Sequence, residues 1–311
     1  MLSRLLHTAL VGLIFGALAA GRLAAEPRTF PPPVVKVENV QQISPHVYVI
    51  PDDLVPQVSN IGFIVGETGI LVIDTGLGPR NGAAIAAVAQ KLGGSRAQYL
   101  VTTHFHPEHD LGAQGFPATT KLIRSTDQIK DIAQYGLQLA NLFVTFSPAH
   151  AELLKGADFR KADSTFEMEY DLDLGGVRAR LIALGPNHTR GDTGIWLEAD
   201  RVLFAGDVVM TLQPAFNSPE ASLRQWLSSL DRLEALKPAL IVPSHGPNGD
   251  AGLISGYRAY LTEVRDRTAA EKRAGRSVDQ AVESVTVALT GRFPDRNRLA
   301  GAIKSAYAEA P

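Results

Sequence analysis

The sequence predicts a mixed α/β protein of the α+β kind, in which two β-sheets form the core and helices lie outside them. Two observations lead to this fold class. Each half of the chain runs through short apolar strands first and through helical segments afterwards. In addition, several potential metal ligands follow directly after apolar strands, and one edge of a two-sheet core can collect such residues into a single site.

Composition agrees with a soluble globular protein. The chain has 311 residues, of which 45% are hydrophobic and 20% charged, enough for one large domain or two small ones. Its formal net charge of −2 gives no reason to expect nucleic acid or an anionic membrane as a partner. The absence of cysteine excludes disulfides and thiolate zinc sites, so any metal site must consist of histidines and carboxylates.

The N-terminus has the pattern of a Sec-type signal peptide. Arg4 precedes an uncharged apolar stretch over residues 5–21, and small residues follow up to Ala25. We expect residues 1–25 to be removed and the mature protein to be exported, into the periplasm, without remaining on the membrane. Cleavage after Ala19 and an uncleaved membrane anchor are the alternatives. Residues 26–42, which include three consecutive prolines, are expected to be an extended lead-in.

The elements of the first half follow from apolar periodicity and turn residues. Residues 66–69, Gly-Glu-Thr-Gly, form the turn of a predicted β-hairpin. The predicted strands are 47–50, 61–65, 70–73 and 99–101, and the predicted helices are 80–92 and one or more within 126–156.

The second half repeats this order. The predicted strands lie within 166–184, with Gly175 and Gly176 as a turn, and at 195–197, 202–204 and 240–242. The predicted helices cover 221–236 and the region from 252 to the end. Ser277 and Gln280 have the spacing of a capping box. The apolar side of the C-terminal helices, with Tyr257, Tyr260 and Leu261, is expected to cover the core or a second subunit of a homodimer.

A dense cluster of ionisable residues follows the strand 99–101. Residues 103–110, Thr-His-Phe-His-Pro-Glu-His-Asp, contain three imidazoles and two carboxylates. Imidazole and carboxylate are the Zn²⁺ ligands that remain when thiols are absent. His104 and His106 alternate, so they can point to the same side of an extended segment, and Pro107 can begin a helix. The cluster predicts a metal site, with a solvated histidine-rich loop as the alternative.

Three further potential ligands lie at the ends of later apolar strands: His188, Asp207 and His245. Four separate strand ends that each supply a ligand favour a single shared site over a chance arrangement. The remaining histidines, His7, His46 and His150, have no such neighbours, and we expect them to have no functional role.

The order of these residues resembles that of the metallo-β-lactamase superfamily, whose pattern is His-x-His-x-Asp-His followed by a distant His, an Asp and a final His. The resemblance covers about residues 43–250 and implies an αββα sandwich with a dinuclear metal site at one edge. Residues 251–311 would be a C-terminal helical extension packed on that domain. It implies that His104, His106 and His188 hold one metal and that Glu108, His109 and His245 hold the other. Asp207 would bridge the two.

Three acidic residues in or near the cluster have different expected roles. The resemblance gives Asp74 the part of orienting the ligands, a role that suits a carboxylate beside a metal-bound imidazole; a turn-forming Asp is the alternative. Glu108 stands where the family usually has Asp, which changes the reach of this ligand by one methylene group. Asp110 is the alternative source of the carboxylate, although its position in the motif differs.

The resemblance implies a hydrolase that binds two Zn²⁺ ions per chain, with Fe or Mn as other candidate metals. Glu108 and Asp207 are the candidate catalytic carboxylates, and a metal-bound hydroxide is the expected nucleophile. The expected substrate is a small molecule with an ester, thioester, lactone, amide or sulfate-type centre. Ser244 is expected to be a loop residue. Asp207 and the expected export favour similarity to the quinoprotein-associated zinc hydrolases.

Two other functions remain open at this point, namely a periplasmic β-lactamase and a non-catalytic metal-binding protein. A di-iron reductase of the same fold would need a flavin domain, for which the residues after 250 are too few and too helical. Within 126–156, Phe143 and Phe146 are expected either to line the pocket or to pack against the core.

Overall fold

The computed structural model describes residues 31–311. The predicted signal peptide, the cleavage near Ala25 and His7 therefore lie outside the described residues, and export stays a prediction. Within residues 31–311, no helix combines the length and the apolar character needed to cross a membrane.

Seven strands form the first sheet, in the order in which they occur along the chain. Strands β1 to β4 pair antiparallel, whereas β4, β5, β6 and β7 pair parallel. The strands are β1 (Gln41–Ser44), β2 (Val47–Ile50), β3 (Ile61–Val65), β4 (Gly69–Ile73), β5 (Ala97–Val101), β6 (Lys121–Ser125) and β7 (Ser164–Phe166).

Five strands form the second sheet, in the order β12-β11-β10-β9-β8. All neighbours are antiparallel except β11 and β12, which run parallel. The strands are β8 (Glu169–Asp173), β9 (Arg178–Ala183), β10 (Thr193–Leu197), β11 (Val202–Gly206) and β12 (Leu240–Pro243). Their directions place the carboxyl ends of β9, β11 and β12 at the same edge of this sheet.

The helices that lie outside the sheets are mostly amphipathic and begin at identifiable caps. Ser125, Ser147, Ser222, Ser277 and Asp295 each accept a backbone hydrogen bond at a helix start, and Ser277 with Gln280 forms the predicted capping box. The helices are η1 (Val37–Asn39), α1 (Gly78–Gly93), α2 (Pro107–Asp110), η2 (Ala113–Gly115), α3 (Thr126–Asp131), the π-helical η3 (Ile132–Gly136), α4 (Leu137–Val144), α5 (Pro148–Leu153), α6 (Leu223–Ala235), α7 (Gly252–Arg273), α8 (Val278–Leu289) and α9 (Arg296–Glu309).

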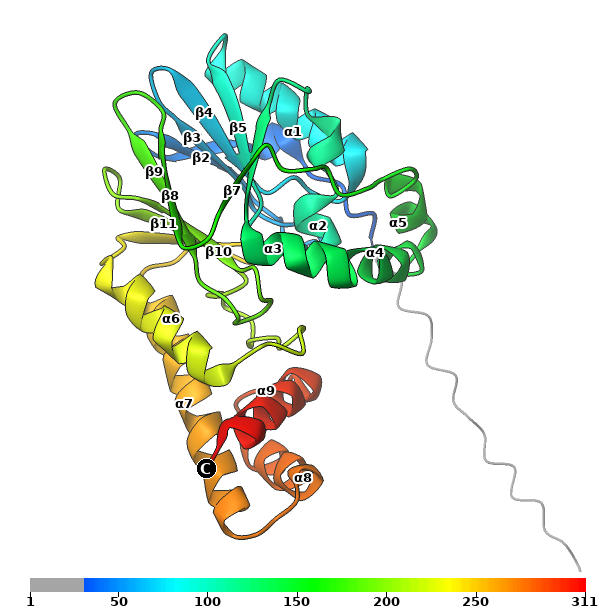
Figure 1. Cartoon of the computed structure of the whole chain (residues 1–311), viewed down its shortest axis with the longest axis vertical. Helices are drawn as coiled ribbons and strands as arrows, with labels where there is room; N and C mark the ends of the chain where they lie inside the picture. The colour runs from blue at the N-terminus through cyan, green and yellow to red at the C-terminus, as the bar shows by residue number, and fades with distance from the viewer. Residues whose placement is uncertain (1–30) are drawn as a thin grey trace, which may run out of the picture.

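Three apolar clusters hold the layers together. The cluster between the sheets contains Leu71 and Ile123 of the first sheet with Leu181 of the second. A second cluster packs α1 on the outer face of the first sheet. The third packs α6 and the C-terminal helices on the outer face of the second sheet. The result is the predicted αββα sandwich, with α1 on one side and α6 and α7 on the other (Figure 1).

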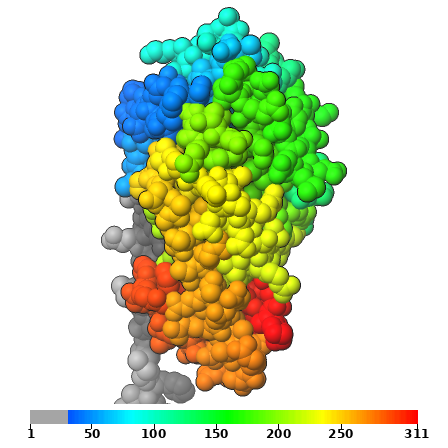
Figure 2. All heavy atoms as spheres, turned by 90° about the vertical axis from the view of Figure 1, so that its left-hand side faces the viewer, coloured from blue at the N-terminus to red at the C-terminus, as the bar shows by residue number. Residues whose placement is uncertain are grey.

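The C-terminal helices share their core with the second sheet. Tyr257, Tyr260 and Leu261 of α7 are buried in the same cluster as Leu203 of β11. These residues therefore cover the sandwich, which was the first of the two alternatives. Helices α7, α8 and α9 form the lower end of the molecule in Figure 2.

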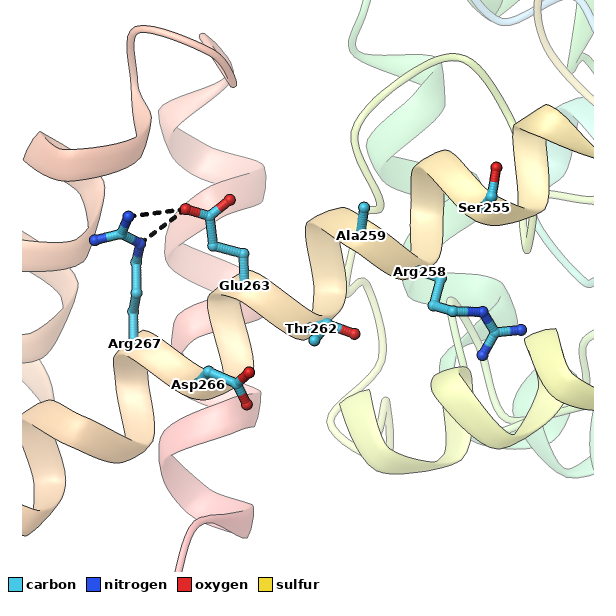
Figure 3. Close-up of a pocket in the computed structure, with 7 residues that line it drawn as sticks. All are labelled: Ser255, Arg258, Ala259, Thr262, Glu263, Asp266 and Arg267. Atoms are coloured by element: carbon cyan, nitrogen blue, oxygen red, sulfur yellow. Dashed lines mark hydrogen bonds and ion pairs between the residues drawn. The ribbon is translucent and has the colours of Figure 1, made fainter.

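Polar contacts also hold α7 on α6. The guanidinium of Arg258 makes ion pairs with Asp231 and Glu234 of α6, and the distance from its Nη2 to Glu234 Oε2 is 2.9 Å. Figure 3 shows the side of α7 that carries Arg258, Glu263 and Arg267, where Glu263 pairs with Arg267.

The predicted strands and helices are present, but β1, β6 and most of β7 were not predicted. The expected extended lead-in contains η1 and the first residues of β1, and its Val35 is packed in the cluster that holds α1 on the first sheet. Strand β6 contains Lys121 and Arg124, so only two of its five residues are apolar and no apolar run marks it. The predicted helical region 126–156 is divided into α3, η3, α4 and α5, with a π-helical turn between α3 and α4.

We expect Leu261→Ala to destabilise the whole protein, because Leu261 is fully buried between α7 and the second sheet. The expected loss is about 2–5 kcal/mol of unfolding free energy. The measurement is urea denaturation followed by tryptophan fluorescence, since Trp196 and Trp226 both belong to the same cluster. Val287→Ala, on the exposed side of α8, should change the free energy by less than about 0.5 kcal/mol. A tryptophan transition that Leu261→Ala leaves in place would contradict the shared core.

Candidate metal centre

The candidate ligands lie at the carboxyl ends of strands from both sheets. His104 and His106 follow β5, His188 follows β9, Asp207 follows β11 directly and His245 follows β12. The two sheets meet at this edge, so residues that are far apart in the sequence come together there.

A short helix turns the remaining two ligands toward the same place. His106 precedes α2 in an extended conformation, and Pro107 occupies the first helical position, where its missing N–H costs no hydrogen bond. Glu108 and His109 then follow on the helix, and both are buried. This is the arrangement that the sequence predicted for Pro107.

The seven predicted ligands form three overlapping groups, within each of which the potential ligand atoms lie within 4.8 Å of one another. The groups are His104 with His106 and His188, then His104 with His109 and Asp207, and finally Glu108 with His109 and His245. The first and last groups are the two ligand sets that the family resemblance implies.

Asp207 lies between these two sets. Its Oδ2 is 3.5 Å from Nε2 of His188, while its Oδ1 is 4.0 Å from Nε2 of His109 and 3.9 Å from Nε2 of His245. One carboxylate therefore has one oxygen toward a histidine of the first set and the other toward two histidines of the second set. A carboxylate in this position suits a bridge between two cations.

Several buried ligand atoms have no hydrogen-bond partner among the described residues. They are Nε2 of His104, Oε2 of Glu108, Nε2 of His109 and Oδ1 of Asp207. Buried polar atoms nearly always have partners, because leaving one unpaired costs about 1–3 kcal/mol. A set of unpaired nitrogen and carboxylate atoms that face one another fits divalent metal ions.

The opposite nitrogens of three imidazoles are held by the protein. Nδ1 of His109 lies 2.9 Å from Oδ2 of Asp74, Nδ1 of His188 lies 2.7 Å from the carbonyl of Ala215, and Nδ1 of His245 lies 2.8 Å from the carbonyl of Val58. Each acceptor favours a proton on Nδ1 and leaves the lone pair of Nε2 toward the centre. Metal-binding histidines are commonly oriented in this way.

The electrostatic environment also favours cations. Burial and the neighbouring imidazoles lower the pKa of His104 and His106 well below the usual value, so both rings are neutral. Burial opposes ionisation of Asp207, but the surrounding imidazoles hold its pKa below the ordinary range. Burial alone would lower the pKa of His109, but the carboxylates of Asp74, Glu108 and Asp207 raise it to about 9.

Asp74 occupies the orienting position that the resemblance implied. In addition to its contact with His109, its Oδ1 accepts a 2.7 Å hydrogen bond from the backbone N–H of Thr103. Its backbone has a φ of +64°, which a residue other than glycine rarely adopts and which is typical of functional sites. No turn is present at residues 74–76, so the structure favours the orienting role over the turn-forming alternative.

Asp110 does not join the ligand groups. Its carboxylate makes a two-point ion pair with the guanidinium of Arg124, with distances of 2.6 Å to Nη2 and 3.0 Å to Nε. Arg124 is 2% exposed and Asp110 is fully buried. The carboxylate beside the second ligand set is that of Glu108, and Asp110 anchors the ligand segment to β6.

Two positioning residues were missed by the sequence analysis. Arg124 lies in β6, one of the strands that were not predicted. Asp192 accepts hydrogen bonds from the backbone N–H of His188, at 2.7 Å, and from Thr189, and so fixes the loop that carries His188. The sequence did contain a signal for Asp192, because an Asp in a Gly-containing loop, four residues after a candidate ligand, often accepts hydrogen bonds from the backbone of that loop.

His46, His150 and Ser244 make contacts with neighbouring protein groups and do not belong to the ligand groups. Nδ1 of His46 lies 2.6 Å from Asp200, and Nδ1 of His150 lies 2.8 Å from the hydroxyl of Ser147. The hydroxyl of Ser244 is directed at Asp74, at 3.5 Å. Ser244 is therefore part of the loop that supports the ligands, as expected.

A cavity of about 1240 Å³ opens beside the ligands. His106, Glu108, His188, Asp207 and His245 line its inner end. Phe143 and Phe146 also line it, although Phe143 is buried in a small cluster with Leu77 and Leu111. The two aromatic residues therefore line the cavity and also pack against a buried apolar cluster, which are the two roles expected for them.

Part of the cavity wall is held by an ion-pair network. Tyr135 of η3 donates a 2.9 Å hydrogen bond to Glu220, which also pairs with Arg190. Asp131 of α3 accepts a 2.8 Å hydrogen bond from the backbone N–H of Gly191 and lies 3.5 Å from Arg190. The network ties the helices beside the cavity to the loop that carries His188.

Comparison with known proteins places this arrangement in a family. The family model described as "Metallo-beta-lactamase superfamily" matches residues 54–245. Among curated proteins, a linear primary-alkylsulfatase from Pseudomonas sp. (strain ATCC 19151) is 21% identical over 78% of this chain and 53% of its own length. A beta-lactamase-like protein 2 homolog from Caenorhabditis elegans is 26% identical over 70% of this chain and 66% of its own length. The chain thus spans less than two thirds of either relative.

Solved structures share the fold. A metallo-beta-lactamase family protein from Thermus thermophilus superposes with a TM-score of 0.61 and 19% identity, over 86% of this chain and 93% of that protein.

We expect Arg124→Met to destabilise the protein by about 3–5 kcal/mol, because it leaves the buried Asp110 carboxylate without its partner. The double variant Asp110→Leu with Arg124→Met removes both charges and should recover at least half of that loss. Urea denaturation of the two single variants and the double variant measures both effects. A double variant that loses the sum of the two single losses would show that the ion pair is not what anchors the segment.

Asp131 should make the stability of the protein depend on pH. Burial raises the pKa of this carboxyl to about 7. Between about pH 4 and 7 the folded state keeps a proton that the unfolded state has lost, so this group's contribution to stability falls as pH rises. Asp131→Asn removes that titration. As pH rises from about 4 to 7, the variant should therefore gain stability relative to the native protein, as measured by urea denaturation at each pH. Asp127→Asn, on the exposed side of α3, is the control and should stay within about 0.5 kcal/mol across the same range.

Proposed function

The chain belongs to the metallo-β-lactamase superfamily, and on that premise we propose that it is a zinc-dependent hydrolase of small-molecule esters, thioesters, lactones or sulfate esters. The observation that carries the proposal is the set of unpaired, buried ligand atoms at the inner end of a large cavity. A substrate that enters this cavity reaches the atoms that would hold the metals.

The ligand types support zinc. Five imidazoles and two carboxylates gather in the centre, and the sequence contains no thiol. This donor set suits Zn²⁺, and it also suits iron or manganese. His104, His106 and His188 would hold one ion, Glu108, His109 and His245 would hold the other, and Asp207 would contact both. When bound, two such ions polarise the scissile group and lower the pKa of water.

The protein's own groups prepare the centre for this chemistry. Asp74 and the carbonyls of Ala215 and Val58 hold the Nδ1 protons of three ligands and so fix the rings. His104, His106 and Asp207 can bind cations without first losing protons, because the pKa of each favours the metal-binding form. His109, whose pKa is raised to about 9, would release a proton when a metal binds. Hydrolysis adds one water molecule across the scissile bond, with the hydroxyl going to the acyl or sulfuryl centre and the proton to the leaving group.

We expect the zinc-loaded mature protein to bind two metal ions per chain and to hydrolyse at least one member of a panel of thioesters, lactones, aryl sulfates and nitrocefin. His106→Ala should reduce the metal content and lower kcat/KM by at least about 100-fold, which exceeds the 10–100-fold typical of residues that only support a ligand. Asp74→Asn should fall within that smaller range. Metal analysis and steady-state kinetics provide the measurements.

His46→Gln is the matched control, because His46 pairs with Asp200 and does not line the cavity. Equal turnover by His106→Ala and the native protein would reject the proposed role of the centre. Turnover of nitrocefin alone would favour a β-lactamase. A protein that binds two metals and is inert to the whole panel would favour a non-catalytic metal-binding protein.

A further inference from the structure

The cavity beside the candidate ligands has two chemically different ends. Its inner end consists of the ligand side chains, which are polar and ionisable. Its outer end is built from α4, from the loop that contains Leu54 and Val55, and from the loop that contains Leu212. These segments are far apart in the sequence, and each contributes a leucine to the lining: Leu54, Leu142 and Leu212. Polar side chains, among them Gln57, Thr211 and Arg298, also line the cavity.

The part of the cavity wall at α4 and the residues just after it is uncharged and largely apolar, although the amide side chains of Gln138 and Asn141 also line the cavity. Leu139, Leu142, Phe143 and Phe146 all line the cavity, and residues 132–146 contain no charged side chain. A partly exposed helix in a protein with 20% charged residues ordinarily carries several charges. Their absence over this stretch indicates a surface that meets an apolar group.

The cavity mouth exposes large apolar side chains to water. Leu54 is 75% exposed, Leu142 is 50% exposed and Leu212 is 46% exposed, and each comes from a different segment. Single exposed leucines are common on protein surfaces. Three that converge on the mouth of one cavity form an apolar patch of the kind that marks a binding site.

The size of the cavity also bears on the substrate. Ligand pockets commonly have about 300–1,000 Å³, and this cavity, at about 1240 Å³, is larger. A small polar substrate would leave most of the apolar wall in contact with water. A substrate with an apolar chain would cover the wall and gain about 25 cal/mol for each Å² of apolar surface that it removes from water.

We propose that the substrate is an amphiphile, whose hydrolysable polar group lies at the ligand end and whose alkyl or acyl chain lies along Leu139, Leu142 and Phe146 toward the mouth. The proposal rests on the proposed hydrolase function, since it names the class of substrate for the same site. Leu142 is the specificity-determining residue at which the wall and the mouth meet.

The first test is a series of acetyl, butyryl, octanoyl and lauroyl thioesters with a common thiol, assayed with the zinc-loaded full chain. We expect kcat/KM to rise about three- to fourfold for each added methylene group until the wall is covered. A flat or falling series would overturn the proposal, whereas the absence of hydrolysis along the whole series would count against the hydrolase function.

The second test measures binding without turnover. Octanoate has six more methylene groups than acetate, so the same gain per methylene group predicts that it binds on the order of a thousandfold more tightly than acetate by titration calorimetry. Leu142→Gln should weaken octanoate about tenfold and leave acetate unchanged. Leu137→Gln is the matched control, since Leu137 is 75% exposed on the same helix and does not line the cavity.

The two tests separate the possible failures. Selective binding of octanoate by a protein that hydrolyses neither the thioester series nor any lactone, aryl sulfate or nitrocefin of the panel would reject the hydrolase function and keep the amphiphile. Equal effects of Leu142→Gln and Leu137→Gln would overturn the role of the wall. A native protein that is dimeric by sedimentation, and that Leu142→Gln turns into a monomer, would assign the exposed leucines to a second copy of the chain and would also overturn the proposal.

Discussion

The ligand segment from Thr103 to Asp110 must hold five buried ionisable side chains close together, and such an arrangement is costly unless the backbone is fixed from outside. Three residues fix it. Asp74 accepts from the N–H of Thr103 and binds His109, Thr75 donates from its N–H and its hydroxyl to the carbonyl of His109, and Arg124 pairs with Asp110. Neighbouring strands β4 and β6 deliver these groups on either side of β5, so the sheet order itself determines the centre.

Much of this arrangement could be predicted from the sequence because each ligand stands next to a local signal. His188, Asp207 and His245 follow apolar strands, and Pro107 marks the start of α2. The groups that support the ligands were harder to predict. Arg124 looks like a surface residue in the sequence, and its burial makes sense only with Asp110, fourteen residues earlier, as its partner. The π-helical turn at η3 likewise depends on packing that no periodicity shows.

The C-terminal helices are joined to the site more closely than their separation in the sequence indicates. Tyr257 and Leu261 pack on the second sheet, and Arg298 of α9 lines the cavity that the candidate ligands also line. The apolar pattern of these helices predicted a covering role, but it could not show that a residue so near the C-terminus lies beside the candidate metal centre. The helical region is therefore part of the substrate environment as well as of the core.

None of the three groups that hold the ligand segment is itself a candidate ligand. Asp74 contacts the backbone N–H of Thr103 and the His109 nitrogen that faces away from the centre. Thr75 contacts a backbone carbonyl, and Arg124 contacts the carboxylate of Asp110, which lies outside the centre. Selection can therefore exchange one donor side chain for another without rebuilding the scaffold. Glu108, which stands where the resemblance led us to expect Asp, is a donor at which such an exchange is possible, because none of the supporting contacts involves its carboxylate. The separation of scaffold from donors gives evolution a way to vary metal preference and reactivity while the fold stays the same.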